Sequence, residues 1–174
     1  MIPGTVFATI HVPKNKSFDA VRLSTPNLTN PSTVTLVDDQ ATILADPTTN
    51  GVATSTKVPA EIQKGLIVLV PDSSGKAYRS LVIDRGDKFA LGTYRLVNFS
   101  RQSIRGAIGT KFLQVASGGI ADLALSGEPG TVQGVRFEFE KDGQWSRLTE
   151  TRCAVRKDRR WLLLAYPDPT SGRI

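Results

Sequence analysis

The chain has 174 residues and a formal net charge of +6 at pH 7, and 40% of its residues are hydrophobic. It is long enough to bury a core as one domain or as two small ones, and it has no apolar run near the roughly 20 residues that a membrane-spanning helix needs. With one cysteine, Cys153, and one histidine, His11, the sequence excludes an intramolecular disulfide and nearly excludes an imidazole or thiolate metal site.

Strand patterns recur along the chain, because β-branched and aromatic residues alternate with polar ones between turns rich in Gly, Pro, Asn and Asp. One short helix is expected at Pro59–Gly65, which starts with proline and ends with glycine. The pattern predicts an all-β fold, an antiparallel β-sandwich of immunoglobulin-like type in one or two modules. The expected strands are Thr5–Val12, Ala20–Ser24, Thr33–Val37, Leu66–Val70, Tyr78–Ile83, Thr93–Phe99, Ile104–Ile108, Lys111–Val115, Ile120–Leu125, Val132–Glu140, Trp145–Thr149, Thr151–Arg156 and Arg160–Tyr166.

The domain organisation depends on the segment Asp46–Pro59, which has no aromatic residue and little periodicity. It is typical of a long surface loop or of a linker. We therefore expect a single β-sandwich domain over residues 1–174. The alternative is an N-terminal β unit at residues 1–58 followed by a C-terminal β-sandwich at residues 59–174.

A polar interruption stands between two alternating stretches in the segment Gly92–Gly109. Alternation places Tyr94, Leu96 and Asn98 on one face of the first strand. An asparagine where a strand ends can bond the backbone of the next turn through its side-chain amide. The sequence predicts that Asn98 stabilises a corner, after which residues 100–103 close a hairpin into the strand Ile104–Ile108.

Asp142-Gly143 is a strong two-residue turn pattern between two strands. It predicts a hairpin that pairs Glu140 with Trp145, Glu138 with Arg147 and Phe137 with Leu148. Trp145 then shares a polar face with the two glutamates. It is expected to lie over aliphatic stems or under a loop, or else to form part of a binding patch.

The last predicted strand, Arg160–Tyr166, is apolar on both faces. Trp161, Leu163 and Ala165 share one face, and Leu162, Leu164 and Tyr166 the other. Such a pattern predicts a central strand covered on both sides. Cys153 lies in a strand-like stretch, which favours a small core residue over a nucleophile.

The positive charge is unevenly distributed, because residues 1–70 carry equal numbers of acidic and basic groups and residues 71–174 supply the whole excess. Six cations lie between Arg147 and Arg160, against Glu150 and Asp158. This region could bind an anion or a nucleic acid, although nucleic-acid binding favours interleaved stacking aromatics. A solvated, charged strand edge is the commoner explanation. We name Trp145, Arg147, Arg156 and Arg159 as candidate ligand-binding residues.

The stretch Gly92–Ser100 has the order Gly-Thr-Tyr-Arg-Leu-Val-Asn-Phe-Ser. Together with the run 65–100 and the later DGQWSRL and RWLLLAYPD, it resembles uncharacterised exported β-sandwich proteins of Gram-negative bacteria, over residues 65–169. The resemblance implies a periplasmic or secreted setting, with a signal peptide removed, and no catalytic residues. A cytoplasmic location is the alternative.

We therefore expect a non-enzymatic structural or binding module that engages a protein, a peptide or a glycan. No catalytic residue, cofactor or metal is predicted, because His11 has no nucleophile or orienting carboxylate that the sequence assigns to it. The first alternative is anion or nucleic-acid binding through residues 147–160. The second is a glycan-active enzyme that works through two carboxylates.

Overall fold

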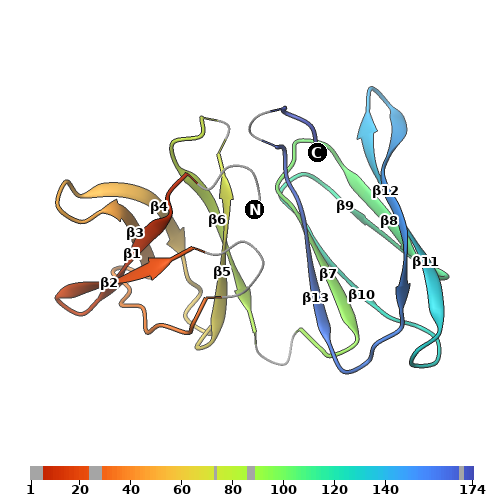
Figure 1. The fold of residues 1–174 in the computed structure, drawn as a ribbon, viewed down its shortest axis with the longest axis horizontal. Coiled ribbons are helices and arrows are strands. Elements are labelled where there is room, and N and C mark those ends of the chain that lie inside the picture. Colours follow the sequence, from red (N-terminus) through yellow and green to blue (C-terminus); the bar gives the residue numbers. More distant parts are fainter. Residues whose placement is uncertain (1–5, 24–28, 73, 86–88, 169–170) are drawn as a thin grey trace. The chain divides into compact units, whose positions relative to one another are not determined.

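The structure is a computed structural model that describes residues 6–23, 29–72, 74–85, 89–168 and 171–174. In these ranges every regular element is a β-strand and none is a helix, so the all-β prediction is confirmed (Figure 1). Nearly all pairs of neighbouring strands are antiparallel. The predicted residues Thr5 and Ser24, at the ends of the first two expected strands, lie outside the described ranges.

The chain divides into two compact units. The first comprises Met1–Gly86 with Asp168–Arg173, and the second comprises Asp87–Pro167 with Ile174. This division falls between residues 86 and 87, whereas the alternative domain boundary expected from the sequence is at residues 58 and 59. Each unit has a hydrophobic core of its own. Whether either unit folds alone stays a prediction.

The first unit contains a four-stranded sheet in the order β2-β1-β3-β4 and the hairpin β5-β6. Its buried cluster includes Ile10, Val12, Ile43 and Tyr78, and the Thr54 and Ser80 hydroxyls join β4 to β6 at 2.8 Å. The strands are β1 (Thr9–Lys14), β2 (Ser17–Arg22), β3 (Gln40–Asp46), β4 (Gly51–Lys57), β5 (Gly65–Pro71) and β6 (Tyr78–Asp84).

The second unit is built from two sheets, β10-β7-β13 and β12-β11-β8-β9. Its strands are β7 (Thr93–Asn98), β8 (Ile104–Ile108), β9 (Lys111–Val115), β10 (Ile120–Ala124), β11 (Val132–Lys141), β12 (Gln144–Ala154) and β13 (Arg160–Ala165). Side chains of both sheets form its core, among them Tyr94 and Leu96 from β7 and Ile104 and Ile108 from β8. The alternation predicted for β7 is therefore confirmed for the Tyr94 and Leu96 face.

Three expectations for the first unit are wrong. The segment Asp46–Pro59 is no linker, since β4 occupies Gly51–Lys57 and pairs with β3. Its buried side is made of Ala53, Thr54 and Thr56, which give no strong apolar alternation. Pro59–Gly65 is a turn, with Ile62 N donating to Pro59 O at 2.9 Å, and not a helix. The expected strand at residues 33–37 is absent from the described sheets, where only Val37 bridges to Gln40.

The hairpin at Asp142-Gly143 has the predicted pairs Glu140 with Trp145 and Glu138 with Arg147. Both turn residues have positive φ, at 51° and 75°, as a two-residue turn of this type requires. Phe137, however, pairs with Thr149 and not with Leu148, because the register shifts between Phe137 and Glu138. Leu148 is the extra residue of a β-bulge, which sequence alternation alone cannot reveal.

The last strand, β13, lies at the edge of its sheet and not at its centre. It pairs with β7 in parallel, in an unbroken register from Arg160 with Thr93 to Ala165 with Asn98. Its predicted inner face is confirmed, since Trp161, Leu163 and Ala165 belong to the core cluster or pack against it. Apolar residues on both faces were a poor guide to its position, because the side-chain pattern does not show which backbone edge of a strand is paired.

The corner after β7 passes the chain from one sheet to the other, so β7 and β8 do not form the expected hairpin. The Asn98 side chain, 1% exposed, bonds this corner as predicted. Its Nδ2 donates to Gln102 O at 2.7 Å and to Val115 O at 3.1 Å. Its Oδ1 accepts from the Ser100 amide and hydroxyl at 2.9 and 2.7 Å. One amide therefore connects the end of β7 to the end of β9.

Candidate functional site

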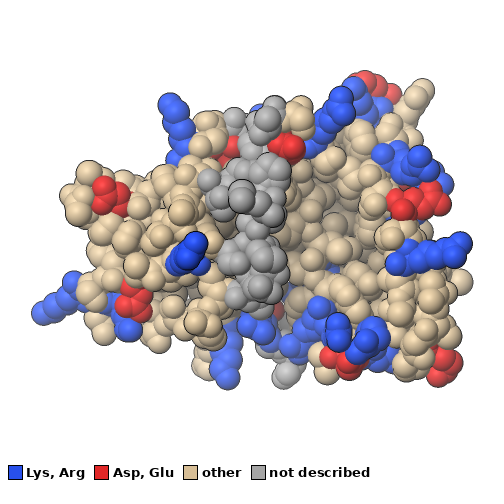
Figure 2. All heavy atoms as spheres, in the orientation of Figure 1, with Lys and Arg blue, Asp and Glu red and all other residues tan. Residues whose placement is uncertain are grey.

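In the second unit, β12 and β13 are edge strands of the two different sheets (Figure 1). Among the described residues, β12 pairs with β11 and β13 pairs with β7, and no pairing joins β12 to β13. An apolar cleft of about 370 Å³ lies between them, which we call the β12–β13 cleft. This volume is within the range of small-molecule pockets. Figure 2 shows a hollow in this part of the face whose atoms are neither acidic nor basic.

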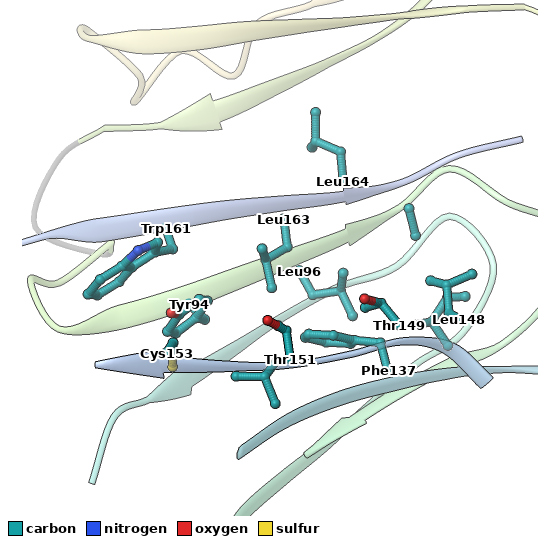
Figure 3. A pocket seen from close by; sticks show the side chains of 13 residues that line it. Tyr94, Leu96, Phe137, Leu148, Thr149, Thr151, Cys153, Trp161, Leu163 and Leu164 are labelled. Carbon is teal, nitrogen blue, oxygen red and sulfur yellow. The ribbon is translucent and has the colours of Figure 1, made fainter. Parts of the chain in front are cut away.

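Both edge strands contribute alternate side chains to the cleft. Trp161, Leu163 and Ala165 come from β13, and Thr149, Thr151 and Cys153 come from β12. Leu164 of β13 also borders the cleft, but its side chain lies on the other side of the strand from Leu163 (Figure 3). The shared parity within each set follows from the two-residue period of a strand. The two threonines are exposed at the opening, and Cys153 is half-buried beside the core, as the sequence indicates.

One end of the cleft is formed by Tyr94, Trp161 and Cys153, which lie close together in Figure 3. The Tyr94 and Trp161 rings stack with their centroids 4.6 Å apart and their planes 7° from parallel. Burial is the main cause that raises the pKa of the Tyr94 phenol, and its hydrogen bond with Cys153 adds to this effect. Tyr94 is therefore neutral at physiological pH, so this end carries no phenolate charge.

Phe137 and Leu148 lie toward the other end (Figure 3). The Phe137 ring lies across the sheet over Gly106 of β8, its register partner. A Cβ at position 106 would overlap this ring. Gly106 therefore sets the depth of the cleft at this point, because a larger residue would displace the ring.

The segment Val155–Arg159 joins β12 to β13, so it bounds the end of the cleft next to Trp161 and Cys153. Val155 is fully buried, and its amide donates to Thr131 O at 2.8 Å. The Arg159 carbonyl accepts from Gly92 N at 2.6 Å. These contacts fix the backbone of the segment while its charged side chains stay exposed.

This end of the cleft is basic. Asp158 is the one acidic residue between positions 151 and 167, against five cations. Arg156 donates to both Asp158 oxygens, at 3.0 and 2.8 Å, and Arg159 lies 3.9 Å from the same carboxylate. The guanidinium of Arg156 is the main cause that lowers the pKa of Asp158. Figure 2 shows blue side chains gathered below the hollow. The five cations are Arg152, Arg156, Lys157, Arg159 and Arg160.

Trp145 lies outside the cleft. The Arg105 guanidinium covers its ring, with Cζ 4.3 Å from the ring centroid. Arg105 also pairs with Glu138, as does Arg136, and the hydrogen bond from Arg105 is the main cause that lowers the Glu138 pKa. Trp145 is therefore part of a charged cluster around Glu138. Although Glu138 and Arg147 are register partners, the ion pairs found for Glu138 are with the other two arginines.

The four candidate residues named from the sequence do not form one site. Arg156 and Arg159 share Asp158 at the basic end of the cleft, whereas Trp145 lies against Arg105. Arg147 pairs with Glu150 at 3.2 Å on exposed surface. The sequence pattern by itself does not mark Thr149, Thr151 and Leu163 as residues of a cleft. The available signal was the doubly apolar last strand, which was assigned to the centre of a sheet.

The fold and the cleft define an all-β protein whose second unit has an apolar cleft between two edge strands. Comparison of the chain with protein-family models, with curated proteins and with solved structures gave no match. In the described part of the chain, no helix is both long and apolar enough to span a membrane. No group of three or more His, Cys, Asp or Glu side chains in that part is arranged to hold a metal ion.

Proposed function

We propose that this chain is a non-enzymatic binding module with an immunoglobulin-like β-sandwich, exported to the periplasm or the exterior, and that it engages a protein or peptide partner. The observation that carries the proposal is the β12–β13 cleft, which is apolar and opens between two strand edges without a common partner. Such edges accept extended peptides through backbone hydrogen bonds, and adjoining pockets select their side chains.

A protein or peptide is favoured over a glycan because of the chemistry of the cleft. Its walls are mainly Trp, Leu, Phe and Ala side chains, and its hydroxyls are those of Tyr94, Thr149 and Thr151. Sugar recognition needs many convergent hydrogen-bonding groups, whereas apolar side chains of a peptide match aliphatic and aromatic walls. Export rests on the resemblance of residues 65–169 to exported β-sandwich proteins.

The binding proposal can be tested with a display library of random peptides of about eight residues, selected on the immobilised chain. Enriched peptides should lose binding to Thr151→Trp, because the indole fills the opening of the cleft. The control is Glu150→Trp, which places the same side chain at the adjacent residue of β12, outside the cleft lining. Absence of any enriched peptide, or equal binding to both variants, would contradict a cleft-dependent function.

Export can be tested by fractionation of the source cells with an antibody against the chain. We expect recovery in the periplasmic or extracellular fraction. Recovery in the cytoplasmic fraction would favour the alternative location. Loss of binding with added salt, together with insensitivity to Thr151→Trp, would instead favour an anionic partner for residues 147–160.

A further inference from the structure

We propose that the β12–β13 cleft binds an extended peptide strand that adds to the free edge of β13, with the carboxyl end of the peptide at the basic loop. This inference rests on the proposed function and adds the conformation, the direction and the side-chain pattern of the ligand. Three observations support it: the composition of β13, the parity of its inner residues and the charge of segment 155–160.

Among the described residues, the edge of β13 that faces away from β7 has no strand partner and lacks the usual protection. Natural edge strands carry charges, prolines or bulges that prevent pairing with other chains. After Arg160 the strand continues Trp-Leu-Leu-Leu-Ala, and its six register pairs with β7 contain no bulge. The facing edge of β12 differs, since it contains a bulge near Leu148 and carries Glu150 and Arg152. An added strand would therefore pair with β13 in preference to β12.

The inner face of β13 determines the side-chain pattern of the ligand. Trp161, Leu163 and Ala165 point into the cleft at every second position. A strand beside β13 presents its own side chains with the same period, so about three of them face the same apolar space. The remaining side chains face outward. The ligand should therefore alternate apolar and polar residues over about six positions.

Charge gives the direction. The segment next to Trp161 carries four cations between positions 156 and 160 and one acid, Asp158. Complementary charges set the register and orientation of a bound partner. Acidic side chains or a free carboxylate at the end of the peptide match this loop. The peptide then runs opposite to β13, which starts at the loop, in the antiparallel arrangement that is slightly the more stable one per residue.

The peptides enriched from the display library, with free carboxyl ends, give the first test. Their consensus should alternate apolar and polar residues and end in acidic residues. Amidation of the carboxyl end of a synthetic consensus peptide should weaken binding roughly three- to tenfold. The double variant Lys157→Glu/Arg159→Glu should weaken binding of the free acid to a similar extent. Lys111→Glu, at the start of β9 and outside the cleft lining, controls for a charge reversal elsewhere on the second unit.

Disulfide exchange with Cys153 gives a second, independent test of the direction in which the peptide binds. It is the only cysteine of the chain and lines the cleft beside Trp161, near the loop. A consensus peptide with an activated cysteine, present as its 2-thiopyridyl disulfide, exchanges with the Cys153 thiolate, forms the peptide–Cys153 disulfide and releases thiopyridone. Exchange should be fast with the activated cysteine near the carboxyl end and slow with it near the amino end. The Cys153→Ser variant, which cannot exchange, gives the background release.

Several outcomes would overturn the inference while the binding proposal stands. They are an enriched consensus without alternation or acidic end, faster exchange from the amino end, and unchanged affinity after amidation. Displacement of the peptide by a second copy of this chain, seen as a peptide-sensitive dimer in sedimentation, would assign the cleft to self-association. Binding of a fatty acid with no enriched peptide would overturn both proposals.

Discussion

At the scale of single residues, Asn98 is a structural link between the two sheets of the second unit. Its amide bonds the corner at Gln102 and Ser100, and it also reaches Val115 at the end of β9. The Asn98 backbone adds two bonds, because its amide donates to Gly119 O and its carbonyl accepts from Gly118 N. The polar interruption in the sequence is therefore a corner that internal hydrogen bonds of Asn98 and Ser100 stabilise.

Asn98→Ala should lower the free energy of unfolding by about 2–4 kcal/mol, because it leaves carbonyl oxygens of the corner without their donor and the Ser100 amide without its acceptor. Chemical denaturation measures this effect. Ser100→Ala removes one hydroxyl of the same network and should cost less. An Asn98→Ala variant as stable as the parent would contradict the structural role and favour one in ligand binding.

Glu138 makes stability dependent on pH. The arginine partners lower its pKa in the folded chain, first of all through the hydrogen bond from Arg105. A carboxylate with a lowered pKa stabilises the fold above its unfolded pKa, and that contribution is lost as pH falls through the folded value. Glu138→Gln should therefore be less stable than the parent at pH 7, and the difference should shrink on acidification.

Denaturant titrations of both proteins between pH 7 and pH 2 measure this difference. Glu128→Gln, on an exposed turn, controls for the loss of one negative charge. A Glu138→Gln deficit that stays constant over the whole range would show that the carboxylate acts through shape and not through its charge.

At the scale of elements, the packing of β8 against β11 depends on Gly106. The Phe137 ring occupies the space that a side chain at position 106 would need. Gly106→Ala should destabilise the chain by about 1–3 kcal/mol through overpacking. Gly134→Ala on β11 is the matched control, since nothing lies within 4 Å of an added Cβ there, and its effect should stay within about 0.5 kcal/mol.

Thermal unfolding of the two glycine variants gives the comparison. If both variants lost the same stability, the destabilisation would come from the backbone and not from overlap with the Phe137 ring. A displaced ring also predicts a changed cleft, so Gly106→Ala should alter the affinity of cleft-binding peptides while Gly134→Ala leaves it unchanged.

At the scale of the whole molecule, each unit has a separate core. Both tryptophans of the chain, Trp145 and Trp161, belong to the second unit. Tryptophan fluorescence therefore reports on this unit alone.

A fragment of residues 87–174 should unfold cooperatively, with the same denaturant midpoint by fluorescence as the full chain. The variant Trp145→Phe keeps Trp161 as the single fluorescent tryptophan, so it shows whether the transition is also seen from the cleft. A fragment without a cooperative transition would mean that the second unit depends on the rest of the chain.

The sequence predicted the strands of the second unit well, because their apolar residues alternate and their turns contain glycine. Ile104–Ile108 and Lys111–Val115 were predicted with the observed bounds. It missed β3 and β4, where the buried positions include Ala41, Ala53, Thr54 and Thr56. In β4 the buried side chains are small or hydroxylated and give no strong apolar pattern, and β3 buries the consecutive Ile43 and Leu44, which breaks its alternation.

The candidate site was less predictable than the fold. Arg156 and Arg159 were named from charge density, and they do lie beside the cleft. The cleft itself arises because β13 pairs with β7, which is more than sixty residues away, and leaves its other edge free. No local pattern contains that pairing.

The sequence by itself therefore determined the all-β class, the Asp142-Gly143 turn and the Asn98 corner, since these follow from side-chain period and local hydrogen bonding. Only the tertiary structure decided that β13 is a parallel edge strand, that Leu148 forms a bulge and that an apolar cleft opens between β12 and β13. The physical reason is that strand order and sheet edges depend on contacts between distant segments, whose energies no short stretch of sequence contains.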